Sequence, residues 1–136
     1  MAGSQGTRRK SNAEIQATQD SIESGTYTPV LSAFTNISAA IPNPWRFIRI
    51  GNIIFVSGTL NLSPTSAGGT PSAFEFTLPI PATVTVTTLS GQGTVSENTT
   101  AANVRVLGNG GVTGRGTFAA LAAGSSGATI TFSYTL

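Results

Sequence analysis

The chain has 136 residues, enough for one domain with a substantial core. Apolar residues make up 39% of it and charged residues only 9%, which argues against intrinsic disorder, since disordered chains combine high charge with few apolar residues. Cysteine and histidine are absent, which excludes disulfides, thiolate chemistry, Ser-His-Asp catalysis and the common zinc sites. A net charge of +2 with sparse Lys and Arg is not typical of a nucleic-acid binder, and no apolar run reaches the ~18 residues of a membrane span.

The N-terminal region, residues 1–24, is polar and is predicted to be an extended arm outside the folded domain. Apart from Ile15 and Ile22 it has almost no large apolar residues, so it cannot build a core of its own. Half of the chain's charged residues lie in this short stretch. A polar arm without a core needs a surface to lie on, and we expect neighbouring subunits to supply that surface.

The arm also carries a short basic cluster. Arg8, Arg9 and Lys10 are consecutive and are followed by the polar segment SNAEIQATQD (11–20), with no apolar segment that could make a secretion signal. Such a cluster is either a solvated basic tip or an anchor for an acidic surface. If the arm lies on a capsid, these three residues are the candidates for contacts with it.

Residues 25–136 are predicted to form an all-β domain. Short runs rich in Val, Ile, Thr and Phe alternate with Gly and Pro turns, and no segment is long enough for a crossover helix. About eight short antiparallel strands of this kind are typical of a jelly-roll-like β-sandwich. The expected strands cover residues 26–34, 45–50, 53–62, 73–78, 84–89, 103–107, 116–122 and 128–136.

The clearest local element is a β-hairpin around Gly51-Asn52. This pair suits a tight two-residue turn, which fixes the register of the two strands. One face continues as an apolar row along the second strand and is assigned to the core, and Gly58 leaves room there for the Trp45 indole. The predicted core residues of the hairpin are Trp45, Phe47, Ile54, Val56, Leu60 and Leu62.

The opposite face of the hairpin gathers four large apolar side chains near the turn. Either a loop of the same chain, such as residues 42–44, covers them, or they form a protein–protein interface, because leaving them in water would forgo roughly 1.5–3 kcal/mol each. In a two-fold contact one patch serves both partners, so we expect a homo-oligomer, with a dimer favoured and a trimer possible. The interface candidates are Ile48, Ile50, Ile53 and Phe55.

The acidic residues do not indicate a catalytic pair. Glycoside hydrolysis requires two facing carboxylates. The β region offers only Glu75 and Glu97, which fall on separate strands or loops and are more simply read as solvated surface acids. The chain is therefore not expected to be an enzyme, and no catalytic residue, cofactor or metal site is predicted.

Five short motifs resemble, in their order, a β domain that recurs in structural proteins of tailed bacteriophages. Together they span most of residues 25–136. The resemblance implies a β-sandwich or jelly-roll building block without enzymatic activity, used on virion surfaces and tail fibres. The motifs are GTYTP (25–29), R-x-G-N (49–52), V-S-G (56–58), LPI (78–80) and a final F-x-Y strand (132–134).

Within that family, the short arm distinguishes two possibilities. A tail-fibre subunit would carry the domain behind a long shaft, so this chain is more similar to capsid decoration, or cement, proteins. That resemblance implies the major capsid protein as partner, a location on the capsid exterior and assembly in the cytoplasm of a bacterial host. The alternative is a tail-fibre or receptor-binding tip module that recognises a host surface glycan. No functional residue carries over, because the shared motifs fall at turn and core positions.

Overall fold

The computed structural model describes residues 22–65, 69–97 and 100–136, and this part of the chain contains ten β-strands and no helix. The all-β prediction is confirmed, with ten strands in place of about eight. The first five strands are β1 (Ile22–Tyr27), β2 (Leu31–Thr35), β3 (Ile37–Pro42), β4 (Trp45–Ile50) and β5 (Ile53–Pro64). The other five are β6 (Ser72–Thr77), β7 (Leu89–Glu97), β8 (Thr100–Gly108), β9 (Thr113–Phe118) and β10 (Ser126–Thr135).

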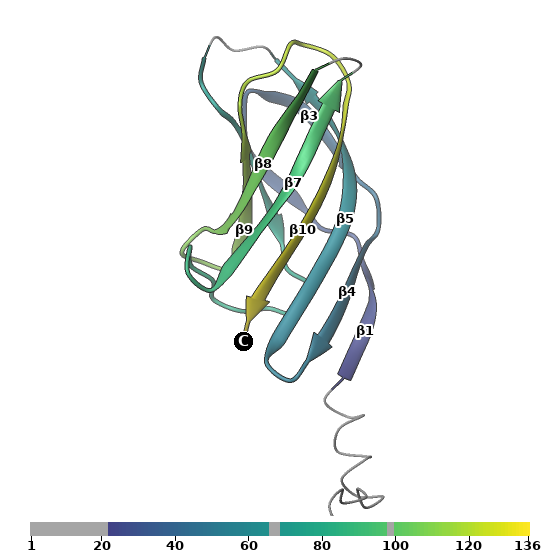
Figure 1. Cartoon of the computed structure of the whole chain (residues 1–136), viewed down its shortest axis with the longest axis vertical. Helices are drawn as coiled ribbons and strands as arrows, with labels where there is room; N and C mark the ends of the chain where they lie inside the picture. Colours follow the sequence, from purple (N-terminus) through teal and green to yellow (C-terminus); the bar gives the residue numbers. More distant parts are fainter. Residues whose placement is uncertain (1–21, 66–68, 98–99) are drawn as a thin grey trace, which may run out of the picture.

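The strands form one antiparallel sheet that curls into a half-barrel, so that two layers face each other as in a sandwich. The strand order is β1-β4-β5-β10-β7-β8-β9-β6-β2, with β3 paired to the part of β5 beyond the hairpin. Figure 1 shows β8, β7, β10, β5, β4 and β1 side by side in the near layer, with β9 behind them. Strand β2 pairs with β6, whereas β3 pairs with β5, so the chain crosses from the β6 side of the curled sheet to the β5 side between β2 and β3. The crossing is at Asn36, which takes a left-handed conformation with φ 56°.

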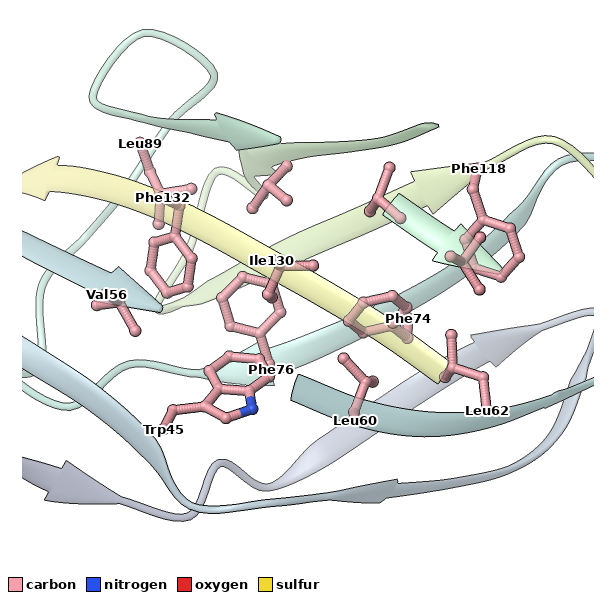
Figure 2. Close-up of a cluster of buried hydrophobic side chains, with 14 of the residues drawn as sticks. Trp45, Val56, Leu60, Leu62, Phe74, Phe76, Leu89, Phe118, Ile130 and Phe132 are labelled. Carbon is pink, nitrogen blue, oxygen red and sulfur yellow. The ribbon is translucent and has the colours of Figure 1, made fainter. Parts of the chain in front are cut away.

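The core fills the space between the layers and centres on aromatic rings (Figure 2). The Trp45 indole lies 5.3 Å from the Phe76 ring, and the Phe76 ring lies 4.9 Å from that of Phe132, measured between centroids. The indole is fully buried, and its Nε1 donates a hydrogen bond of 2.9 Å to the Thr59 carbonyl oxygen. An added Cβ at Gly58 would lie 2.0 Å from the indole Cδ1, so the predicted fit of indole against glycine is confirmed.

Strand β7 was not predicted, because its sequence, LSGQGTVSE, reads as a glycine-rich turn. In the structure Gly91 and Gly93 lie opposite Phe132 and Ile130 of β10. A Cβ at Gly91 would lie 2.1 Å from the Thr131 carbonyl oxygen, and one at Gly93 would lie 2.1 Å from the Thr129 carbonyl oxygen. The glycines therefore belong to the strand, since no side chain fits where β7 and β10 approach.

The strand predicted at 84–89 is wrong. Val84 makes only an isolated bridge to Gly111, and the next residues form a turn in which the Thr85 carbonyl oxygen accepts hydrogen bonds from the backbone N–H groups of Thr88 and Leu89. The threonine side chains support this turn, since the Thr88 hydroxyl accepts a 2.8 Å bond from the Thr85 N–H. Short hydroxyl side chains that bond to nearby backbone groups compete with strand pairing, which is why β-propensity failed here.

The expected strand at 26–34 is divided, and β3 was not predicted. Pro29 lies between β1 and β2 and has no N–H to donate to a sheet. Beyond it the Val30 N–H donates a 2.9 Å bond to the Thr77 hydroxyl. At the other end, Ile22 to Ser24 belong to β1 and pair with β4, although they were assigned to the arm. The rest of the expected arm, residues 1–21, lies outside the described residues.

Tyr134 is buried and Tyr27 is partly buried, and both hydroxyls are hydrogen-bonded, which predicts loss of stability at alkaline pH. The Tyr134 hydroxyl donates to the Ile80 carbonyl oxygen at 2.8 Å, and the Tyr27 hydroxyl donates to that of Thr77 at 3.1 Å. Burial raises the pKa of both phenols above the usual 10. The folded state therefore keeps these protons while the unfolded state loses them, so the stabilisation is complete below pH 10 and is lost as pH rises beyond it.

We expect the free energy of unfolding, measured by urea denaturation, to fall above pH 10 by up to about 1.4 kcal/mol per pH unit for each tyrosine. The double variant Tyr27→Phe/Tyr134→Phe should lose about 1 kcal/mol per removed hydrogen bond at pH 7 and should also lose this pH dependence. An unchanged alkaline slope in the double variant would contradict the prediction.

Candidate interaction surface

The four apolar residues predicted at the hairpin do lie together on the outer face of the sheet. The register is the one expected from the turn, with Ile48 opposite Phe55 and Ile50 opposite Ile53. Their side chains are 39–50% exposed, whereas their neighbours Ile54 and Val56 on the other face are buried. The division of the hairpin into a core face and an outer apolar face is therefore correct.

The possibility that residues 42–44 cover these side chains is wrong. Asn43 is held beside Thr59, where its backbone N–H donates to the Thr59 carbonyl oxygen at 3.0 Å and its side-chain amide donates to the Thr59 hydroxyl at 2.8 Å. At about 3.3 Å per residue, Thr59 lies about 20 Å along β5 from Ile53. The segment is thus fixed at a distance from the turn end of the hairpin.

A fifth apolar residue extends this surface. Ile22 of β1 pairs with Ile50 of β4, so its side chain lies on the same outer face, and it is 47% exposed. Sequence reasoning missed it because the residue was counted with the arm, and its sequence context IESGTY has no apolar alternation to indicate a strand. Ile22, Ile48, Ile50, Ile53 and Phe55 are called the hairpin patch from here on.

The nearest ion pair lies outside the hairpin patch. A carboxylate oxygen of Glu23 is 4.0 Å from a guanidinium nitrogen of Arg49, and the Arg49 Nε donates a 2.8 Å bond to the Gly51 carbonyl oxygen. Both residues alternate with patch residues along β1 and β4, so they project to the other side of these strands. The pair is largely exposed and contributes at most about 1 kcal/mol. The hairpin patch itself is uncharged.

Beside the hairpin patch, two open hollows cross the outer face of the near layer. The first, of about 710 Å³, lies over β4, β5, β10 and β7. The second, of about 590 Å³, continues over β7, β10 and β8, and the two share Gly91, Gln92 and Thr131. They are therefore one continuous depression, called the outer trough from here on. It crosses β4, β5, β10, β7 and β8. These strands lie side by side in Figure 1.

A single row of paired residues runs through the outer trough and has an arginine at each end. The pairing places Arg46 opposite Ser57, Ser57 opposite Thr131, Thr131 opposite Gln92 and Gln92 opposite Arg105. Four strand spacings of ~4.8 Å put the backbones of the two arginines about 19 Å apart along the sheet. All five side chains are exposed. Among the described residues that line the trough, none carries a carboxylate.

Of the other residues considered from sequence, Glu75 and Glu97 lie in neither the hairpin patch nor the outer trough. Arg8, Arg9 and Lys10 lie outside the described residues. Glu75 on β6 accepts hydrogen bonds from the Asn109 amide and, at 3.4 Å, from the Thr113 hydroxyl. Glu97 ends β7, a strand that the sheet order separates from β6 by β8 and β9.

Two further findings concern only residues 22–65, 69–97 and 100–136. No group of three or more Asp, Glu, His or Cys side chains is placed there to hold a metal ion. No helix of sufficient length and apolar character to cross a membrane occurs there either.

Comparison with known proteins adds no relative. No protein-family model, no curated protein and no solved structure matches this chain. The resemblance to phage virion β domains therefore stands on the five sequence motifs alone, and the hairpin patch and the outer trough have to be interpreted from their own chemistry.

Proposed function

We propose that this protein is a non-enzymatic structural protein of a bacteriophage virion, which binds the outside of the capsid and stabilises it. The observation that carries the proposal is the hairpin patch, in which five large apolar side chains are 39–50% exposed on one end of one sheet face. Full burial of such side chains is worth roughly 1.5–3 kcal/mol each. Because these side chains are about half exposed, a substantial part of that free energy would be gained only when a partner covers them. Large clustered apolar patches of this kind mark protein–protein contacts.

The stabilising mechanism is mass action. A subunit that binds the assembled shell and not its separated parts shifts the equilibrium towards the shell, by an amount that grows with subunit concentration. The hairpin patch would contact a second copy of this chain, and the major capsid protein is the proposed lattice partner. This division suits a decoration protein, because an oligomer engages several lattice positions at once and raises the effective concentration of each contact.

Residues 1–21 would add a second contact, since they precede β1 in the sequence and β1 begins within the hairpin patch at Ile22. The basic cluster Arg8, Arg9 and Lys10 would contact acidic groups on the capsid, and exposed contacts of this kind are individually weak and screened by salt.

We expect the replacement of all three basic residues by Ala to weaken capsid binding several-fold and to reduce its salt dependence, measured by co-sedimentation with purified capsids at low and high salt. The variant Arg115→Ala, which removes an exposed arginine from β9, is the control. Equal affinities and equal salt dependence for the triple variant and the parent would contradict the role of the cluster.

The direct test of the proposed function is location and copy number. Phage particles are purified, the protein is quantified by mass spectrometry against the major capsid protein, and an antibody against it is located by immunogold electron microscopy. Hundreds of copies per particle with label over the head are the expected result. A complete absence from particles would overturn the proposal.

A second candidate is a tail-fibre or receptor-binding tip module that recognises a host surface glycan, and the outer trough favours it. A handful of copies per particle, with label at the tail end, would select this candidate over the first.

A further inference from the structure

We propose that the outer trough is a binding site for an acidic oligosaccharide. Carboxylates of the sugar chain would bind the guanidinium groups of Arg46 and Arg105, and its hydroxyls would bind the polar row between them. This site adjoins the hairpin patch, and its first hollow shares Ile48 and Phe55 with it. It does not rest on the capsid proposal, because a decoration protein and a tail-tip module could each carry it.

The charge of the trough indicates an anionic ligand. Arg46 lines one hollow and Arg105 the other, and no described lining residue supplies a negative charge. Guanidinium groups bind carboxylates through two parallel charge-assisted hydrogen bonds, which are stronger than the bonds they make to the uncharged hydroxyls of a neutral sugar. Between the arginines, Ser57, Thr131 and Gln92 supply hydroxyl and amide groups that both donate and accept hydrogen bonds.

The same charge argues against three other occupants. The N-terminal residues 1–21 carry Arg8, Arg9 and Lys10 against only Glu14 and Asp20, so the two arginines would repel that segment. A second copy of the chain is a poor ligand as well, since the whole chain has only five acidic residues. Nucleic acid would require a denser stripe of Lys and Arg than two arginines about 19 Å apart.

An acidic peptide is the remaining alternative, and the position of the trough disfavours it. Extended peptides usually bind β-sheets by adding a strand at an edge, where unpaired backbone groups are available. The trough crosses the middle of the sheet, over strands that already pair on both sides, so a peptide would find only side-chain contacts there.

The same face offers a sugar chain both hydrogen-bonding groups and an apolar surface. Ser57, Ser90, Gln92, Thr131 and Ser133 line the first hollow with hydrogen-bonding groups. The ring of Phe55, which also belongs to the hairpin patch, is 46% exposed in the isolated chain. There it borders the hollow and offers an apolar surface for one side of a pyranose. A few polar groups beside an aromatic surface are typical of small-ligand sites, and the combination selects a carbohydrate here.

The experiment titrates the full-length protein with α-1,4-linked tetragalacturonate and follows binding by calorimetry and by ¹H–¹⁵N NMR. The matched neutral probe is the same tetrasaccharide with its carboxylates reduced to alcohols. We expect the acidic probe to shift the amide signals of Gly91, Gln92 and Thr131 and to bind at least tenfold more tightly than the neutral probe, because charge-assisted hydrogen bonds are stronger than bonds between neutral groups.

Variants locate the site. Arg46→Gln and Arg105→Gln should each weaken binding about three- to tenfold, since exposed charge pairs contribute less than buried ones. The double variant should weaken it further. Arg115→Gln, which removes an arginine of equal charge from β9, should leave the affinity unchanged. Circular dichroism of each variant confirms that the fold is retained, which is expected because all three side chains are exposed.

Four outcomes would overturn the proposal. The first is no binding of the acidic tetrasaccharide at millimolar concentration. The second is equal affinity for the neutral probe, which would remove the charge argument. The third is equal or tighter binding of hexaglutamate, which would make the trough a peptide site. The fourth is equal weakening by Arg115→Gln, which would mean that binding follows net charge and not the trough.

Discussion

We expect the single substitution Gly91→Ala to lower the free energy of unfolding by about 3 kcal/mol, a large effect for the addition of one methyl group. The new Cβ would lie 2.1 Å from the Thr131 carbonyl oxygen, 2.4 Å from the Phe132 Cβ and 2.5 Å from the Phe132 Cα. The first and last of these atoms belong to the backbone of the neighbouring strand, so no side-chain rotation relieves the clash. Strands β7 and β10 would have to separate at the centre of the near layer.

Gly127→Ala is the matched control, because Gly127 lies in β10 between Asn61 and Ser96 but a Cβ there meets no atom within 4 Å. It should leave stability unchanged or raise it by about 0.5–1 kcal/mol, since alanine restricts the unfolded chain. Thermal and urea denaturation measure both variants, and Gly91→Ala should lower Tm by roughly 10 °C. Equal stability of the two variants would mean that the close approach of β7 and β10 relaxes without cost.

This comparison also explains why β7 could not be predicted. Local propensity assigns Gly91 and Gly93 to a turn, whereas their actual role depends on contacts with Phe132 and Ile130, about 40 residues later in the chain. Gly114 and Gly116 of β9 have the same kind of role, since an added Cβ would meet the rings of Phe76 and Phe74 within 2.3 and 2.6 Å. Glycine in this fold makes room for aromatic rings and for the curl of the sheet, and a single sequence cannot separate that use from a turn.

The hairpin was predictable because its determinants are local. Gly51-Asn52 fixes the turn and thereby the register, and the register fixes which side chains share a face. The apolar outer face therefore followed from about eighteen consecutive residues. Ile22 was missed because its place in the patch depends on the pairing of β1 with β4, a non-local contact. The outer trough could not be predicted for the same reason. Arg46 and Arg105 lie in one row of paired residues only because the strands are ordered β4-β5-β10-β7-β8.

The second large expected effect is the loss of self-association when the exposed hairpin patch is altered. We expect the parent protein to sediment as a dimer and Phe55→Lys to sediment as a monomer. Loss of one central aromatic contact typically costs about 2 kcal/mol, and a two-fold interface contains the substituted position twice, so the dimer dissociation constant should rise about 10³-fold. Phe55 is 46% exposed in the isolated chain, so the charged side chain can reach water in the monomer and the fold should be retained.

Val112→Lys is the control for this prediction. Val112 is 64% exposed in the connection between β8 and β9, so the substitution adds the same charge and removes a similar apolar side chain far from the hairpin in the sheet order. It should leave the dimer intact. A parent protein that stays monomeric at high concentration would end the self-association hypothesis and leave the hairpin patch to a different partner. A dimer that survives Phe55→Lys would place the contact elsewhere, because a two-fold interface centred on this patch cannot accommodate two facing lysines without losing most of its affinity.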